Sequence, residues 1–153
     1  MGTNGNIKKI LIKDLCSRLP YGVKGQAKGM IKFFADEEVS EEPWTLTSIN
    51  VQLNTFGADT QTGIPLFNRR TGICNFKQYL FPMSSMTEEQ NDSWRDAWFP
   101  DLMSSTDINY PESEKYLALS HYKSMDWLYK HHFDINGLIE KGLAIDATGL
   151  NIY

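Results

Sequence analysis

The sequence lacks the short motifs that mark most catalytic and phosphate-binding sites. Its 153 residues contain no G-x-x-x-x-G-K-[ST] loop, no G-x-S-x-G, no H-E-x-x-H and no Cys-x-x-Cys. Only three histidines are present. His131 and His132 are neighbours that would point about 100° apart on a helix, so they cannot act as an i, i+4 metal-binding pair. We therefore expect no catalytic residues, no metal and no cofactor.

Cysteines and long apolar runs are also scarce. The two cysteines, Cys16 and Cys74, occur in a chain whose first residues lack the apolar stretch of a secretory signal. We therefore expect two reduced thiols that pack as small hydrophobes. No apolar run is long enough to span a membrane. Together these absences predict a cytoplasmic protein without a membrane segment.

The net charge has the wrong sign for a general nucleic-acid-binding protein, because the formal value is -4. In other respects the composition is that of an ordinary globular protein, with 41% hydrophobic and 22% charged residues. A chain of this length can bury a hydrophobic core without disulfides or metals. We therefore expect one domain over residues 1–153.

The first half of the chain predicts a helix followed by strands. Leucines recur at helical spacing within residues 7–19, and Pro20 ends that helix. Residues 44–56 have the clearest strand pattern, because Val51 and Leu53 continue an alternation of apolar and polar residues. The other expected features are strands over 23–35, 66–69 and 73–80, a bulge near 47–48, an acidic loop over 36–42 and a loop over 57–65.

The second half of the chain predicts helices. Thr87 and Gln90 fit a capping box, in which each side chain accepts a hydrogen bond from the backbone amide of the other residue. Residues 112–133 form the longest expected helix, and Asp134 is expected to cap a short helix that ends at Gly142. The apolar residues at helical spacing on the long helix predict a core stripe of Ala118, Tyr122, Met125, Tyr129 and Phe133.

These patterns together predict an α+β fold. A small, strongly bent antiparallel sheet within the β-rich part, residues 20–81, follows the first short helix and packs with the helices of residues 86–142. The change from strands to helices falls at Pro82. Residues 103–112 are expected as a polar linker inside the domain, and residues 143–145 as an edge strand.

The first candidate site is a basic cluster in an otherwise acidic protein. Arg18, Tyr21, Lys24 and Lys28 surround a helix end and a glycine-rich strand. Glycines allow a ligand to approach the backbone closely, and cations neutralise a phosphate or a carboxylate. The alternative is a hairpin bordered by solvated lysines, with no ligand at all.

The second candidate site is the start of the helix that follows Pro82. Ser84, Ser85 and Thr87 offer small hydroxyls beside free backbone amides, which together suit an anion. The alternative is an ordinary helix cap, because two glutamates in the first turn would repel an anion. We expect this helix start and the basic cluster to meet at the seam between the two halves of the domain.

The third candidate is a face of the long helix. Trp127 falls opposite the expected core stripe, and Tyr116, Lys123 and His131 lie around it on that side. Aromatic rings beside cations can stack a nucleobase or anchor a protein partner. The alternative is that Trp127 is buried against the tryptophans of the preceding helix.

Three segments resemble a family of small proteins encoded by Bacteroides and related gut bacteria, often in phages or prophages. They are KDLCxRLPYGVK at residues 13–24, YLxPMSSMTEE at 79–89 and GLIxKGLAI at 137–145. The family has no assigned catalytic residues, so the resemblance implies a context and not a site. It implies an accessory protein of a mobile element that acts in the cytoplasm of a bacterial host. One class of such proteins counters host defence by sequestering nucleotide signals.

Three hypotheses follow, in decreasing order of support. The first is a protein that captures a phosphorylated small molecule such as a nucleotide signal. The second is a module that inhibits or recruits a host protein through the Trp127 face, which would also suit a homodimer. The third is nucleic-acid binding through Arg69, Arg70 and the segment from Lys24 to Lys28.

Overall fold

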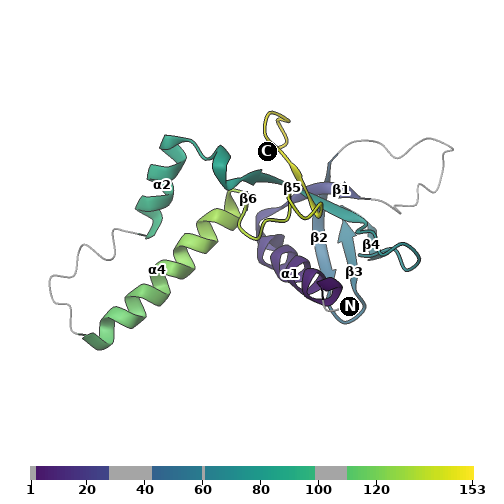
Figure 1. Ribbon diagram of the computed structural model, residues 1–153, viewed down its shortest axis with the longest axis horizontal. Coiled ribbons are helices and arrows are strands. Elements are labelled where there is room, and N and C mark those ends of the chain that lie inside the picture. The colour runs from purple at the N-terminus through teal and green to yellow at the C-terminus, as the bar shows by residue number, and fades with distance from the viewer. Residues whose placement is uncertain (1–2, 28–42, 60, 99–109) are drawn as a thin grey trace.

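The computed structural model describes residues 3–27, 43–59, 61–98 and 110–153. It has the expected α+β fold, in which one helix packs on a sheet and two further helices extend away from it (Figure 1). The elements are α1 (Thr3–Arg18), the 3₁₀ turn η1 (Leu19–Tyr21), β1 (Lys24–Ala27), β2 (Trp44–Asn50), β3 (Thr55–Ala58), β4 (Gln61–Pro65), β5 (Phe76–Pro82), η2 (Met83–Ser85), α2 (Glu88–Trp98), α4 (Tyr110–Lys130), β6 (Phe133–Asp134) and β7 (Ala144–Asp146).

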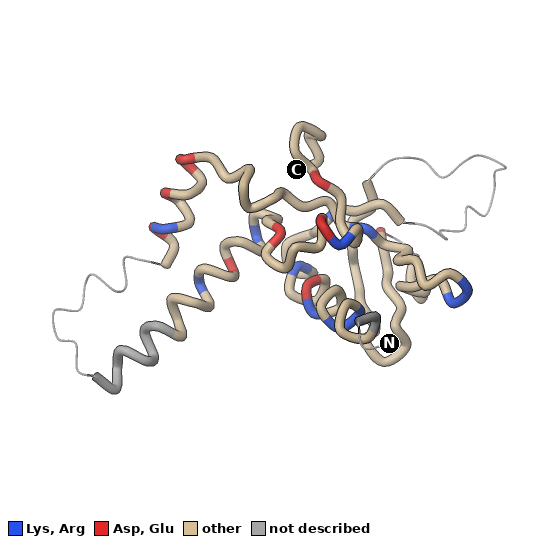
Figure 2. The backbone as a smooth tube through the Cα atoms, viewed as in Figure 1, with Lys and Arg blue, Asp and Glu red and all other residues tan. Residues whose placement is uncertain are grey.

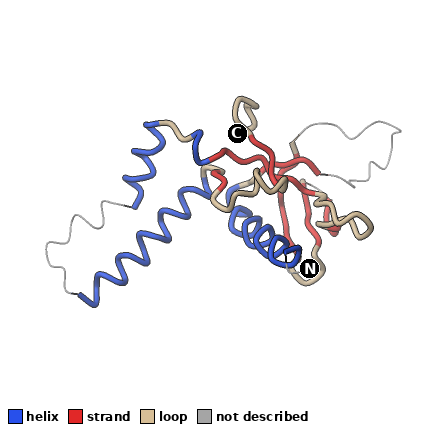
Figure 3. Tube along the Cα trace, viewed as in Figure 1, coloured by secondary structure: helices blue, strands red, loops and turns tan. Residues whose placement is uncertain are grey.

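The sheet is mixed, whereas the sequence predicted an antiparallel one. Its strand order is β4-β3-β2-β1-β5-β6, and β7 also pairs with β5. Strands β1 to β5 pair in antiparallel fashion, but β6 and β7 lie parallel to β5 along the same edge. Parallel pairing needs a long crossover, and α2 and α4 provide it (Figure 3).

The clearest predicted strand, residues 44–56, is in fact a hairpin. Strand β2 ends at Asn50, whose side-chain oxygen accepts a hydrogen bond from the Leu53 amide at 3.0 Å, and Asn54 takes a left-handed φ of 51°. Val51 and Leu53 are therefore in the turn, 56% and 70% exposed. The alternation of apolar and polar residues that suggested a strand continues into this turn. There Asn50 and Asn54 favour a turn conformation of the backbone.

The other predictions for the region around the hairpin have mixed outcomes. The bulge is confirmed, since the β2–β3 register shifts between Leu46 and Ser48. The expected loop over residues 57–65 is wrong, because it contains the end of β3 and all of β4. The strand expected over 66–69 is reduced to the single Phe67–Cys74 bridge. The strand expected over 73–80 is observed as β5, which starts three residues later than predicted.

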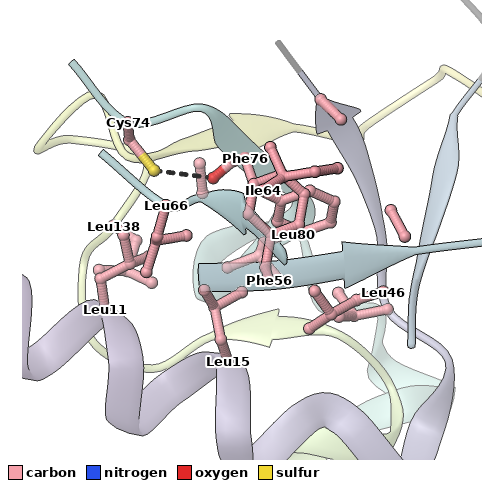
Figure 4. Close-up of a cluster of buried hydrophobic side chains, with 14 residues drawn as sticks. Leu11, Leu15, Leu46, Phe56, Ile64, Leu66, Cys74, Phe76, Leu80 and Leu138 are labelled. Atoms are coloured by element: carbon pink, nitrogen blue, oxygen red, sulfur yellow. Dashed lines mark hydrogen bonds between the residues drawn. The ribbon is translucent and has the colours of Figure 1, made fainter. Parts of the chain in front are cut away.

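The main core lies between α1 and the sheet. Leu11 and Leu15 of α1 are fully buried and point toward the strands, as Figure 4 shows. Phe56 and Phe76 meet there with ring centroids 5.2 Å apart. Cys74, Phe76 and Leu80 share this core, as the sequence predicted. Each large buried side chain stabilises the fold by about 1.5–3 kcal/mol.

A second, smaller core joins the helical arm to the sheet. Trp127, Leu128 and Phe133 form its buried centre. The core stripe predicted for the long helix is only partly right. Ala118 is exposed and Tyr122 is 67% exposed, whereas Met125 packs against this second core, and Phe133 is buried but belongs to β6. Apolar and aromatic residues occur on both sides of α4, so periodicity alone could not decide which side packs.

The segment after α4 contains turns in place of the predicted short helix. Asp134 does act as a cap, since its carboxylate accepts hydrogen bonds from the amides of Leu138 at 2.8 Å and Ile139 at 2.9 Å. Gly142 is in a left-handed conformation, with φ of 69°. The predicted strand near residues 143–145 is confirmed as β7.

Other predictions fall partly or wholly outside the described residues. The strand predicted over 23–35 is observed only as β1, and the acidic loop over 36–42 and most of the linker over 103–112 are not described. Helix α4 begins at residue 110, inside the predicted linker. Within the described part of the chain, no helix combines the length and hydrophobicity needed to cross a bilayer.

Candidate functional site

Arg18, the first predicted ligand residue, is an interior side chain. It is fully buried, and its guanidinium donates to Asp14 at 2.7 Å and to the Phe133 carbonyl at 2.6 Å. The Tyr129 ring lies against the same group, 4.9 Å from centroid to guanidinium carbon. Arg18 therefore joins α1 to β6 and α4 and cannot reach a ligand at the surface.

Asp14 is the centre of a buried polar cluster. Besides Arg18, its carboxylate accepts hydrogen bonds from Gln78 at 2.6 Å and from Asn136 at 2.8 Å. We call Asp14, Arg18, Gln78 and Asn136 the Asp14 cluster. Three of its four members are fully buried, so each charge depends on its partner for compensation. The cluster fastens α1, β5 and the loop before β7 to one another.

Tyr21 and Lys24 are half-buried, and each donates a hydrogen bond to another segment of the protein. The Tyr21 hydroxyl donates to the Asp126 carboxylate on α4, and this hydrogen bond, more than burial, raises the pKa of Tyr21 to about 12. The Lys24 ammonium donates to the Ile152 carbonyl at 3.0 Å. Lys28 lies outside the described residues. The predicted basic cluster thus separates into contacts that hold the fold.

The glycine-rich strand is explained by packing. A Cβ at Gly25 would lie 2.6 Å from both the Phe76 ring and the Lys77 carbonyl of β5. Such distances are too short for any side chain, so Gly25 is required for β1 to lie against β5. The absence of a side chain at Gly25 therefore allows the two strands to pack, and it gives no support to the hypothesis that a ligand approaches the backbone here.

The predicted anion site at the start of α2 is an ordinary helix cap. The Thr87 hydroxyl accepts from the Gln90 amide at 3.1 Å, and the Gln90 side chain accepts from the Thr87 amide at 2.9 Å, which confirms the capping box. The Ser85 hydroxyl donates to the Pro82 carbonyl at 2.7 Å, and Ser84 is exposed. These hydroxyls belong to the local turn. None of the three residues lines either of the two cavities described below.

The Trp127 face is interior as well. Trp127 is only 9% exposed and stacks between His131, at 3.8 Å between ring centroids, and Phe133, at 5.9 Å. The contact surface predicted for it is therefore wrong, and the alternative, burial beside the preceding helix, is confirmed by the shared core with Trp94. Lys123 is half-buried on the same helix, and the side chain of Tyr116 lies outside the described residues.

A second polar contact between segments distant in sequence was not predicted. Tyr153 stacks on His132 with centroids 3.7 Å apart, and its hydroxyl accepts from the Lys24 amide at 3.0 Å and donates to the Tyr79 carbonyl at 2.9 Å. Burial, followed by the nearby Arg18 charge, lowers the pKa of His132 to about 4. Nothing in the sequence links these residues, because the contacts join positions far apart in the chain.

The two cysteines are free, as predicted, but only one is buried. Cys74 lies in the main core, where burial raises the pKa of its thiol. Cys16 is exposed on α1, which contradicts the expectation that both pack among apolar neighbours. The described part of the chain contains no group of three histidine, cysteine or acidic side chains that could hold a metal ion.

A surface cavity bordered by cations lies at the other end of the sheet. A cavity of about 320 Å³ opens between α1, the β2–β3 turn and the loop before β5. The side chains that give it chemical character are Lys8, Phe67 and Arg69, with Asn54 and Leu53 beside them. The Lys8 ammonium lies over the Phe67 ring, 4.9 Å from its centroid. One aromatic ring and two cations thus border the same space.

The loop that carries Arg69 is held by its own hydrogen bonds. The Asn68 side chain accepts from the amides of Arg70 at 2.9 Å and Thr71 at 3.1 Å, and the Asn68 amide donates to Ile73 at 2.8 Å. On either side of the loop, Leu66 and Cys74 are buried in the main core. These contacts fix the positions of the backbone atoms of Arg69 and Arg70.

A second cavity of about 450 Å³ adjoins the first. Pro65, Asn68 and Arg69 line both, and Arg70 and Asn75 line only the second. We call the two cavities together the Arg69 groove. Lys8, Arg69 and Arg70 form no ion pair with any carboxylate of the described residues. Figure 2 shows the basic residues of α1 and of this loop at one end of the molecule and the acidic α2 at the other.

This arrangement can bind anions. Guanidinium and ammonium groups bind phosphate through charge-assisted hydrogen bonds, and an exposed aromatic edge or face can contact a planar ring. From the sequence, Arg69 and Arg70 were candidates only for nucleic-acid binding, and no pattern marked Lys8 or Phe67. Lys8 and Arg69 are 61 positions apart in the chain, and no local pattern brings them together.

A scan against models of protein families, a search of curated proteins and a search of solved structures found no match to this chain.

Proposed function

We propose that this protein binds a phosphate-bearing small molecule of the nucleotide type, with the first cavity of the Arg69 groove as the binding site. The observation that carries the proposal is the convergence of Lys8, Arg69 and Phe67 on one cavity of ligand size. Ligand pockets are about 300–1,000 Å³, and the first cavity lies within that range. Its cations are also free of described carboxylates, which would otherwise compete with a phosphate.

Each part of a nucleotide has a counterpart in the site. Lys8 and Arg69 supply positive charge for the phosphate, and Phe67 and the exposed Leu53 supply apolar surface for the sugar or the base. Asn54 borders the same space and carries both a donor and an acceptor. The ordered loop backbone lowers the entropic cost of holding a ligand.

Sequestration of a nucleotide signal, which the resemblance to phage-associated proteins implies, is the specific biological form of this proposal. The groove contributes cations, amides and an aromatic ring, and these groups bind without performing bond chemistry. Interaction with a host protein through Trp127, and the homodimer that an exposed Trp127 would suit, lose their structural argument because that side chain is buried.

The test is binding of adenosine and guanosine monophosphates, measured by calorimetry at low salt and by the shift in melting temperature. We expect Lys8→Ala to weaken binding by about tenfold, since a charge-assisted contact contributes roughly 1.5 kcal/mol or more. Lys9→Ala is the matched control, because Lys9 is an exposed lysine on the same helix that does not line either cavity. No binding at millimolar nucleotide, or equal losses in the two variants, would refute the proposal.

A further inference from the structure

The two cavities of the Arg69 groove share a wall, and Arg69 is part of it. Lys8 lines only the first cavity, Arg70 lines only the second, and Arg69 lines both. Three cations are thus distributed over two neighbouring cavities, and a single arginine lines both. A mononucleotide in the first cavity would leave the second cavity and Arg70 unused.

We infer that the Arg69 groove takes an extended ligand with at least two phosphates joined through a nucleoside, and that Arg69 sits where its two halves meet. This inference rests on the proposed function and names the ligand class for the same site. The volumes support it, because cavities of about 320 and 450 Å³ are each large enough for one nucleotide unit.

The charge distribution supports the same ligand class. The chain as a whole is acidic, with a formal charge of -4, so the three cations that line the two cavities are a local concentration of positive charge. Lys8, Arg69 and Arg70 provide three positive charges for two or more phosphates. Asn68 and Asn75 also line the second cavity, where their side chains hold the loop backbone.

Hydrogen bonds within the loop hold its backbone at Arg69 and Arg70. Asn68 holds the backbone of the turn, and the Asn75 side chain donates to the Pro65 carbonyl at 2.8 Å across its base. Gly72 completes the turn with a φ of 69°, a conformation that other residues adopt only with strain. A ligand that contacts both arginines therefore gains two charge-assisted contacts without first having to order the loop.

The experiment compares three probes of increasing length on the intact protein: adenosine monophosphate, the 5′-phosphorylated dinucleotide of adenosine, and the corresponding tetranucleotide. We expect the dinucleotide to bind at least tenfold more tightly than the monophosphate. Arg70→Ala should remove most of that gain, while Lys9→Ala should leave all three affinities within twofold of the unmodified protein. Added salt should weaken dinucleotide binding more steeply than monophosphate binding, because more counterions are released.

The arms of the experiment separate the two sources of such a ligand. A tetranucleotide that binds as tightly as the dinucleotide identifies a dinucleotide site, and one that binds more tightly still identifies a site for single-stranded oligonucleotides. Equal affinities for monophosphate and dinucleotide would overturn the inference and leave the proposed function intact. If the Arg70→Ala variant still bound the dinucleotide more tightly than the monophosphate by the same factor, the inference would also be overturned. If no probe bound, both the inference and the proposed function would be overturned.

Discussion

The Asp14 cluster and the Arg69 groove contain similar side chains in opposite circumstances. In the Asp14 cluster, an arginine and two amides surround a carboxylate that matches the charge, and three of the four residues are fully buried. In the Arg69 groove, three cations and several amides border open space with no described carboxylate among them. A cation that is paired with a buried carboxylate holds the fold together, whereas a cation without such a partner can bind a ligand.

The largest effect that would test this comparison is expected at Asp14. Asp14→Asn removes the charge that compensates the buried Arg18, so we expect a loss of about 3–5 kcal/mol in the free energy of unfolding, measured by urea denaturation. The control is Asp92→Asn, which breaks the exposed pair with Arg95 and should cost under about 1 kcal/mol. A loss below 1 kcal/mol at Asp14 would remove the structural role assigned to the cluster.

The next effect concerns Trp127, which packs beside Phe133, the residue whose carbonyl holds Arg18. Trp127→Ala should destabilise the protein by about 3 kcal/mol, because it empties a large part of the second core. Tyr122→Ala, on the exposed side of the same helix, should change the free energy of unfolding by less than about 0.5 kcal/mol. If the two variants were equally stable, the Trp127 face would again be a candidate contact surface.

A smaller effect should appear in the pH dependence of stability. His132 has a pKa of about 4 in the folded protein, below its ordinary value, so the unfolded chain binds more protons than the folded one between the two values. Stability should therefore be complete above about pH 6.5 and fall by roughly 2–3 kcal/mol as the pH drops toward 4. His132→Asn should flatten this dependence, since Asn has no titrating group and tolerates the left-handed φ of 62° at this position.

The matched control for this profile is His121→Asn, at an exposed position on α4. It should leave the slope between pH 4 and 6.5 unchanged. A slope that persists in His132→Asn would assign the pH dependence to other groups and would contradict the buried, neutral state of this histidine.

The fold class and several local devices were predictable because short-range rules determine them. The capping box at Thr87 and the helix before Pro20 each depend on residues within one or two turns, and both are observed. The hairpin at Val51 to Asn54 was missed because apolar alternation outweighed a turn set by Asn50 and Asn54. Local patterns compete, and the sequence does not show which one prevails.

The site could not be predicted because burial and pairing are long-range properties. Arg18 looked like a free cation until Asp14, Phe133 and Tyr129 were placed around it. Lys8 looked like a solvated lysine until Phe67 and Arg69 came beside it. Asp14 lies four residues before Arg18, a spacing at which opposite charges pair on a helix, so this one contact was open to prediction. The other deciding neighbours are distant in sequence, and no spacing rule connects them.

The most direct test of the account measures nucleotide affinity and unfolding free energy together on two variants, one from each region. Arg69→Ala should weaken binding by at least about tenfold while changing stability by less than about 0.5 kcal/mol. Asn136→Ala, which removes a hydrogen bond to Asp14, should cost about 1 kcal/mol of stability and leave affinity unchanged. The account would be contradicted if Asn136→Ala weakened binding and Arg69→Ala did not, because the ligand would then belong to the interior cluster.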